Sequence, residues 1–236
     1  MTDPAPEAAT ARDAVLAAAL PHVPFDGWSD ATLRAAARDA GVPSALARAL
    51  FPRGGIDLAM AFHRAGDAEM ARRLAETDLV ALRFRDRIAR AVRVRLELVE
   101  DRELVRRGAT LFALPQHVAA GARALWSTAD AIWTALGDDK RALSWWTKRA
   151  TLSGVYGATV LYWLGDDSPG HAATWDFLDR RIEDVMRFEK AKAAMRDNPL
   201  GKAMANLPFG KARFRMPPMP ERPDDLPGRM PGFGPR

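Results

Sequence analysis

Hydrophobic and polar positions follow a helical period over most of the chain. From about residue 11 to 165, Ala, Leu and Arg dominate, no strand-like alternation persists, and Gly and Pro fall between the periodic segments. The predicted helices cover residues of about 11–21, 30–40, 44–51, from 56 onward, 79–105, 115–136, 144–165 and 169–195. The pattern therefore predicts an all-α fold.

Residues 144–165 form the most apolar of these segments. No charged side chain occurs between Arg149 and Asp166. Aromatic residues are frequent in the segment: Trp145, Trp146, Tyr156, Tyr162 and Trp163. Small residues recur at helical spacing on one face: Ala150, Gly154 and Ala158. A helix that is apolar nearly all round must be enclosed, and this one is shorter than the roughly 20 apolar residues that span a bilayer. We expect a central helix whose small face admits a close neighbour or a guest molecule.

The aromatic side chains allow three interpretations: plain core, the lining of an elongated apolar cavity, or a protein interface. For the cavity, the candidate lipid-binding residues are Leu125, Trp126, Ile132, Trp133, Tyr156, Val160 and Trp163. Adjacent Trp145 and Trp146 diverge by about 100° on a helix, so at least one should be exposed. Exposed Trp beside Arg149 is typical of an interface, which makes these three residues the candidate partner-binding site.

Residues Leu33 to Phe51 have the shape of a helix-turn-helix, with a glycine-containing turn between two helices. A DNA-binding protein is one interpretation. The outward positions predicted for the second helix are Ala45, Ala47 and Arg48, whereas base recognition requires several polar side chains. A helix-turn-helix kept only as architecture, with no nucleic-acid partner, is therefore the favoured interpretation.

The overall composition narrows the choice of partner and compartment. The net charge of +5 suits nucleic acid or an anionic membrane surface. The absence of cysteine excludes disulfides, thiolate zinc sites and cysteine nucleophiles. The first ten residues have the features of neither a secretory signal nor a transit peptide. We expect a cytoplasmic protein, peripheral on the inner (cytoplasmic) membrane.

No catalytic or metal-ligating pattern is present in the sequence. The histidines His22, His63, His117 and His171 are scattered, and none has a ligand spacing. His63 and Asp67 lie four residues apart on one helix face, which is typical of a surface hydrogen bond. Neither a nucleophile elbow nor a phosphate-binding loop occurs. The sequence therefore predicts no catalytic residue, no metal and no cofactor.

The composition changes beyond Asn198. Residues 198–236 are rich in Pro and Gly, and the part up to Met216 alternates apolar and cationic side chains. Such a segment can lie in a membrane interface, or it can be a frayed tail. The candidate membrane-contact residues are Leu200, Lys202, Met204 and Leu207. The predicted domains are residues 11–55 (helix-turn-helix part), 56–197 (helical lipid-binding domain) and 198–236 (basic tail).

Two parts of the chain resemble known families. The N-terminal part, through LRAAARDAGVPSALARALFP, resembles the N-terminal domain of TetR-type regulators. The block SWWTKRATLSGVYGATVLYWLGDDSPGHAATWDFLDRRIEDVMRF is similar to the ubiquinone-biosynthesis accessory family, which shares that fold. Its matching positions are Trp145, Trp146, Thr147, Lys148, Arg149, Asp167, Ser168, Pro169, Trp175, Phe177 and Leu178. Trp146 stands where the family usually has Tyr, and the resemblance covers residues of about 11–190.

The resemblance implies an all-α, TetR-like helical bundle, a homodimer, that binds lipid and does not read DNA. It implies a bound isoprenoid or phospholipid, and a non-catalytic role in presenting quinone intermediates to the membrane-associated demethoxyubiquinone hydroxylase. The hydroxylase contact would fall on Trp145, Trp146 and Arg149, and a membrane helix after Met195. The alternatives are a TetR-type ligand-responsive repressor and an enzyme whose catalytic groups the sequence does not show.

Overall fold

The computed structural model describes residues 4–138 and 144–197, which form helices and contain no strand. The elements are α1 (Pro4–Ala19), α2 (Val23–Asp26), α3 (Asp30–Asp39), α4 (Ser44–Leu50), α5 (Gly55–Ala75), α6 (Phe84–Glu97), α7 (Arg102–Ala113), α8 (Val118–Ala135), α9 (Trp145–Leu164), the 3₁₀ turn η1 (Pro169–His171) and α10 (Ala172–Asp197). The predicted all-α class is confirmed.

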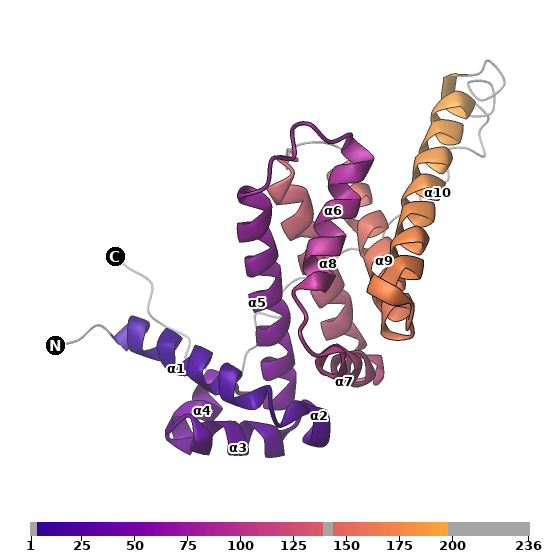
Figure 1. Cartoon of the computed structure of the whole chain (residues 1–236). Coiled ribbons are helices and arrows are strands. Elements are labelled where there is room, and N and C mark those ends of the chain that lie inside the picture. Colours follow the sequence, from indigo (N-terminus) through magenta and orange to yellow (C-terminus); the bar gives the residue numbers. More distant parts are fainter. Residues whose placement is uncertain (1–3, 139–143, 198–236) are drawn as a thin grey trace, which may run out of the picture. The chain divides into compact units, whose positions relative to one another are not determined.

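Helices α1 to α4 form the N-terminal part, which gathers at one end of α5 (Figure 1). Ser29 caps α3 by accepting a hydrogen bond from the Thr32 backbone N–H. The turn before α4 contains Gly41 at φ +65°, a conformation that favours glycine. Fully or nearly fully buried side chains fill the interior: Val15, Ala19, Val23, Leu33, Ala36, Ala37 and Phe51. This part therefore has its own buried apolar core.

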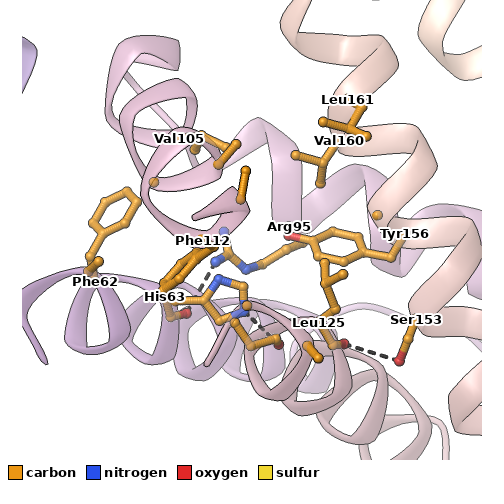
Figure 2. Close-up of a pocket in the computed structure, with 18 of the residues that line it drawn as sticks. Phe62, His63, Arg95, Val105, Phe112, Leu125, Ser153, Tyr156, Val160 and Leu161 are labelled. Carbon is orange, nitrogen blue, oxygen red and sulfur yellow. Dashed lines mark hydrogen bonds between the residues drawn. The ribbon is translucent and has the colours of Figure 1, made fainter. Parts of the chain in front are cut away.

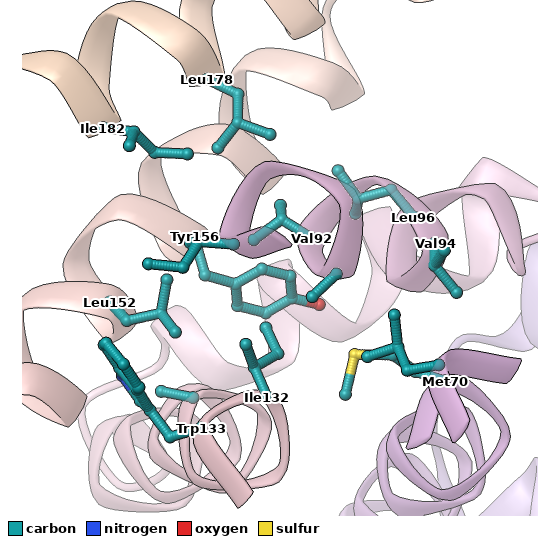
Figure 3. Packing of buried hydrophobic residues seen from close by; sticks show 14 of the residues in the cluster. Met70, Val92, Val94, Leu96, Ile132, Trp133, Leu152, Tyr156, Leu178 and Ile182 are labelled. Atoms are coloured by element: carbon teal, nitrogen blue, oxygen red, sulfur yellow. The ribbon is translucent and has the colours of Figure 1, made fainter. Parts of the chain in front are cut away.

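Helices α5, α6, α8 and α9 form the second part, in which α8 contacts α5, α6 and α9. Its core contains large apolar side chains from every one of these helices, together with two from α10 (Figure 3). Figure 3 labels Met70, Val92, Val94, Leu96, Ile132, Trp133, Leu152, Tyr156, Leu178 and Ile182. The central helix predicted at 144–165 corresponds to α9, and neighbouring helices enclose its buried side.

The prediction of a single helix over residues 79–105 is wrong. The chain leaves α6 after Glu97 and starts α7 at Arg102, because the Asp101 side chain accepts a hydrogen bond from the Glu103 backbone N–H and caps a new helix. After this break α7 contacts α2, α8 and α9. The Trp28 indole, which donates to the Leu104 carbonyl at 3.0 Å, ties α7 to the N-terminal part.

The described residues up to Met186 belong to one compact unit, and those from Arg187 belong to a second. The first unit contains α1 to α9, and α10 crosses the boundary between the two. Within the described residues no helix combines the length and apolarity needed to cross a membrane. The predicted tail 198–236 lies outside the described residues, as do its membrane-contact candidates Leu200, Lys202, Met204 and Leu207.

Candidate functional site

A cavity of about 600 Å³ lies among α5, α6, α7, α8 and α9, with Trp28 contributing from the N-terminal part. Most of its wall is apolar (Figure 2). Prominent side chains in the wall are Phe62, Val105, Phe112, Leu125, Tyr156 and Val160. A volume of this size is within the range of 300–1,000 Å³ that is typical of pockets for drug-sized ligands.

Small residues create the space. Gly108 and Ala109 of α7, and Gly154 and Gly157 of α9, all line the cavity. A Cβ atom added at Gly154 would meet nothing within 4 Å, whereas one at Gly157 would lie 3.2 Å from a Leu125 methyl group. The small face of α9 that the sequence predicted therefore leaves room beside it over Gly154.

The cavity opens between the start of α8 and the second half of α9. Val118 and Leu161 line the cavity and are 53% and 67% exposed, respectively. Leu114, between α7 and α8, is also largely exposed. Exposed apolar side chains around an opening are a feature of sites that receive an apolar ligand or contact another apolar surface.

Two polar residues of the cavity wall, His63 and Arg95, belong to a buried polar cluster. The Asp67 carboxylate accepts hydrogen bonds from Arg95 Nε at 2.9 Å, Thr128 Oγ1 at 2.8 Å and Ser127 Oγ at 2.9 Å. His63 Nε2 lies 2.8 Å from both the Ala124 carbonyl oxygen and Thr128 Oγ1. The expectation of a surface hydrogen bond between His63 and Asp67 is wrong, because α6 and α8 cover both residues and their side chains are largely buried.

Burial also sets the protonation of this polar cluster. It lowers the pKa of His63, an effect that the Arg95 charge adds to and the Asp67 charge opposes. Burial raises the pKa of Tyr156 above its ordinary value, because it disfavours the charged form of each residue. For Arg95, burial disfavours the charge, but Tyr156 and Asp67 outweigh it and raise the pKa. At neutral pH the cluster therefore holds an uncharged His63 beside an Arg95–Asp67 ion pair.

Three of the seven candidate lipid-binding residues, Leu125, Tyr156 and Val160, line the cavity. The structure does not bring the other four into its wall. Ile132, Trp133 and Trp163 belong instead to the buried core cluster, which also contains apolar residues of α6 and α10. Trp126 instead contacts the tryptophans at the start of α9, in edge-on and tilted geometry. Sequence reasoning missed the contribution of α7, whose Gly108-Ala109 pair was the available signal.

Trp126, Trp145 and Trp146 form a cluster of aromatic rings, which we call the tryptophan cluster. Their ring centroids lie 4.9–5.8 Å apart. Trp146 is 63% exposed, and Trp145 is half-buried. The prediction that at least one of the adjacent tryptophans is exposed is confirmed. Two large rings packed around an exposed one are typical of an interface anchor.

Arg149 is not on that exposed surface. Its side chain is completely buried, with Nε 2.5 Å from Asp130 Oδ1 and Nη1 3.0 Å from Asp138 Oδ2. Burial raises the pKa of Asp138, but hydrogen bonds from Lys148 and Arg149 overcome this and hold it below its ordinary value. The guanidinium also lies 4.2 Å from the Trp145 ring centroid. Arg149 thus links the start of α9 to α8 and packs against the Trp145 ring of the tryptophan cluster.

Few polar side chains lie on the exposed face of α4. The exposed residues of α4 are Ser44, Ala45, Leu46, Arg48 and Ala49. Ala47, which was expected to face outward, is only 2% exposed because it packs into the N-terminal core. A single cation and a single hydroxyl remain where base recognition uses several polar groups. Among the described residues, no cluster of His, Cys, Asp or Glu is suited to holding a metal ion.

Comparison with known proteins reveals similarity to one protein family. Residues 118–189 match the model of the COQ9 family. The mitochondrial ubiquinone biosynthesis protein COQ9 of Rattus norvegicus is 35% identical over 182 residues, covering 74% of this chain and 58% of that protein. The corresponding proteins of Drosophila melanogaster and Homo sapiens are each 33% identical, covering 75% and 74% of this chain and 56% and 57% of their own lengths. The chain thus spans a little over half the length of these relatives.

The relatives contradict the predicted location. The sequence predicted a cytoplasmic protein, peripheral on the inner (cytoplasmic) membrane, whereas these relatives are named mitochondrial proteins. That prediction is wrong, because the net charge, the absence of cysteine and the composition of the first ten residues do not identify a compartment.

A solved structure agrees with the expected architecture. A TetR transcriptional regulator from Nitrosomonas europaea aligns with a TM-score of 0.58 at 23% identity, covering 73% of this chain and 95% of that one. At this identity the likeness concerns the fold alone, and it confirms the predicted TetR-like bundle. Over residues 118–189 the chain thus matches the COQ9 family, and its fold is TetR-like.

Proposed function

We propose that this chain is a non-catalytic, lipid-binding accessory protein of ubiquinone biosynthesis that takes up an isoprenoid or another lipid. The observation that carries the proposal is the apolar cavity among α5 to α9, with its exposed apolar opening at Val118 and Leu161. The names of the COQ9 relatives supply the pathway. An apolar wall shields the tail of a lipid from water, and each buried methylene contributes about 0.8 kcal/mol.

The test is the lipid content of the purified chain. After gentle purification, organic extraction and mass spectrometry should recover close to one isoprenoid or phospholipid per chain. After delipidation, the chain should rebind one equivalent of a fluorescent isoprenoid probe. A chain that carries no lipid and shows no saturable binding of the probe contradicts the proposal.

The tryptophan cluster is the proposed contact for the demethoxyubiquinone hydroxylase. Exposed Trp146 is braced by Trp126 and Trp145, so a partner meets a rigid apolar surface whose ordering costs little entropy. In this account the bound quinone intermediate is presented to the hydroxylase while the complex rests on a membrane surface. The membrane contact at Leu200, Lys202, Met204 and Leu207 and the homodimer remain predictions.

Substitution of Trp146 tests this contact. Trp146→Ala should weaken capture of the hydroxylase at least 30-fold, about 2 kcal/mol, because the exposed ring is the anchor. The matched control is Phe25→Ala, which removes a ring that is 84% exposed in the N-terminal part. The control should capture the hydroxylase as well as the unaltered chain. Equal capture by both variants would exclude the tryptophan cluster from the contact.

A ligand-responsive repressor is the less favoured function. It needs the same cavity but also a helix α4 that reads bases, and α4 exposes only Ser44 and Arg48 as polar side chains. An enzyme is disfavoured too, since the polar cluster at the cavity is an ion pair with neutral partners and includes no activated nucleophile.

A further inference from the structure

We infer that a polar cleft between α1 and α5 binds a phosphate monoester, either in a soluble metabolite or in the head group of an anionic lipid. The cleft has a volume of about 740 Å³. Its lining residues come from α1, from the end of α4 and the turn that follows it, and from α5. The inference is independent of the proposed lipid-binding function, because it concerns another place on the molecule.

The cleft is separate from the apolar cavity. Helix α1 lies beside one end of α5 (Figure 1), and α5 borders both hollows with different faces. Asp57, Ala61 and Ala65 line the cleft, whereas Phe62 and His63 line the cavity. The two sets of lining residues have no member in common. A molecule in the cleft therefore leaves the cavity free for another ligand.

Three arginines from separate elements line the cleft. They are Arg12 of α1, Arg53 of the turn before α5, and Arg64 of α5. Its lining also contains two acidic residues, Asp13 and Asp57, so positive charge is in excess. Guanidinium groups present several N–H donors in one plane and bind phosphate oxygens in pairs. An excess of cations around one hollow favours an anionic guest.

Two of these guanidiniums are already held in place. Arg12 donates from Nη1 to the Leu50 carbonyl at 2.8 Å, and its guanidinium lies 4.6 Å from the Phe51 ring centroid. Arg53 donates from Nε and Nη2 to Asp57 Oδ1 at 3.0 and 2.6 Å. An arginine that is already ordered loses little side-chain entropy when it binds an anion.

Hydrogen-bond donors remain for a guest. Within residues 4–138 and 144–197, no hydrogen bond occupies Arg53 Nη1, and no ion pair or hydrogen bond engages the exposed Arg64 side chain. Farther along α5 the arginines are paired, since Arg72 and Arg73 both bond to Glu69. Arg64 is therefore a cation at the cleft that is available to a phosphate oxygen.

Apolar side chains complete the wall of the cleft. Ala61 is buried, and Leu16 and Leu50 are partly buried. The small side chains of Ala61 and Ala65, about one turn apart on α5, leave space between the helices. A phosphate monoester that carries a small apolar group matches this wall, because the arginines bind the phosphate and the leucines cover the apolar group.

The test uses phenyl phosphate and phenyl sulfate, which have the same shape but carry roughly two and one negative charges at pH 7.5. Isothermal titration calorimetry of the full chain at low salt should show one phenyl phosphate per chain, and at least threefold weaker binding of phenyl sulfate. Arg64→Gln should weaken phenyl phosphate at least fivefold, because a charge-assisted hydrogen bond is lost. The matched control Arg34→Gln removes an exposed cation of α3, outside the cleft, and should bind normally.

A second variant distinguishes a shaped site from general attraction to positive charge. Ala65→Leu keeps every charge but fills part of the cleft, so the affinity for phenyl phosphate should fall at least fivefold. Its control Ala45→Leu adds the same side chain at an exposed position of α4 and should bind normally. Absence of saturable phenyl phosphate binding, or equal binding by Arg64→Gln and the unaltered chain, would overturn the inference. Unchanged binding by Ala65→Leu would overturn the cleft as its location.

Vesicles distinguish the two sources of the phosphate. Phosphatidic acid presents the same monoester in a lipid head group, so flotation with vesicles of phosphatidylcholine and phosphatidic acid is the second arm. Flotation that Arg64→Gln reduces and Arg34→Gln does not would assign the site to a lipid head group. Flotation that neither variant changes, together with Arg64-dependent binding of phenyl phosphate, would assign it to a soluble ester.

Discussion

The N-terminal part, α1 to α4, and the cavity part, α5 to α9, use their interiors in opposite ways. In the N-terminal part Val15, Val23 and Phe51 are completely buried and close the core. In the cavity part Gly154 leaves space that neighbouring side chains do not fill. Under the proposed function, the ligand lies in the bundle and the helix-turn-helix supports it.

The N-terminal part and the cavity part also differ in their charged residues. The exposed face of α4 carries Arg48 as its single charged side chain. In contrast, the cavity part buries two arginines, Arg95 and Arg149, each paired with aspartate. Buried ion pairs cost desolvation and are easily replaced by apolar packing where only stability is needed. Their presence beside the cavity and beneath the tryptophan cluster fits a functional role for both places.

The largest expected effect is on the stability of the cavity part. Arg149→Met should lower the free energy of unfolding by about 3–5 kcal/mol, because it leaves Asp138 buried without its arginine partner. Chemical denaturation followed by circular dichroism measures this change. The control Lys148→Met removes the more exposed partner of Asp138 and should cost much less. If both variants lose the same stability, Arg149 is not the anchor described here.

The next effect concerns the empty space beside α9. Gly154→Leu should weaken isoprenoid binding at least 30-fold while preserving the fold, because the new side chain occupies the cavity and replaces a glycine within a helix. Ala150→Leu, one turn earlier at an exposed position, should bind normally. Probe titration of the two variants gives the ratio. Unchanged binding by Gly154→Leu would mean that the lipid occupies another place.

A smaller effect is expected from pH. Burial lowers the pKa of His63, so the unfolded chain takes up a proton more readily than the folded chain. This contribution to stability is complete above the ordinary histidine pKa of about 6.5 and declines as pH falls below it, by at most ~1.4 kcal/mol one unit lower. Denaturation curves at pH 7.5 and 5.5 should show a smaller decline for His63→Leu. An equal decline would place the titrating group elsewhere.

The smallest effect is expected in the N-terminal part. Arg48→Glu should change neither stability nor lipid binding measurably, since Arg48 is exposed on α4. Any DNA binding by the unaltered chain should be weak, independent of sequence and lost at physiological salt. Electrophoretic mobility shifts with random duplexes measure it. Tight, sequence-selective binding that Arg48→Glu abolishes would restore the repressor interpretation.

The sequence predicted the helices and the small face of α9, because these depend on local periodicity and residue size. It failed where the outcome depends on packing between helices. Residues 79–105 have one continuous pattern, yet the Asp101 cap divides them into two helices. Arg149 is buried because Asp130 and Asp138 of the preceding segment surround it. His63 and Asp67 face inward because α6 and α8 cover them, which spacing along one helix cannot reveal.

The most direct test of the account is photo-crosslinking with a diazirine-bearing isoprenoid, followed by mapping of the labelled residues. The account predicts labels on the cavity wall, at Val105, Leu125 and Val160, none on α3 or α4, and their loss in Gly154→Leu. Labels concentrated on α1 to α4, or unchanged in Gly154→Leu, would contradict a division of the molecule into a solid support and a lipid-binding bundle.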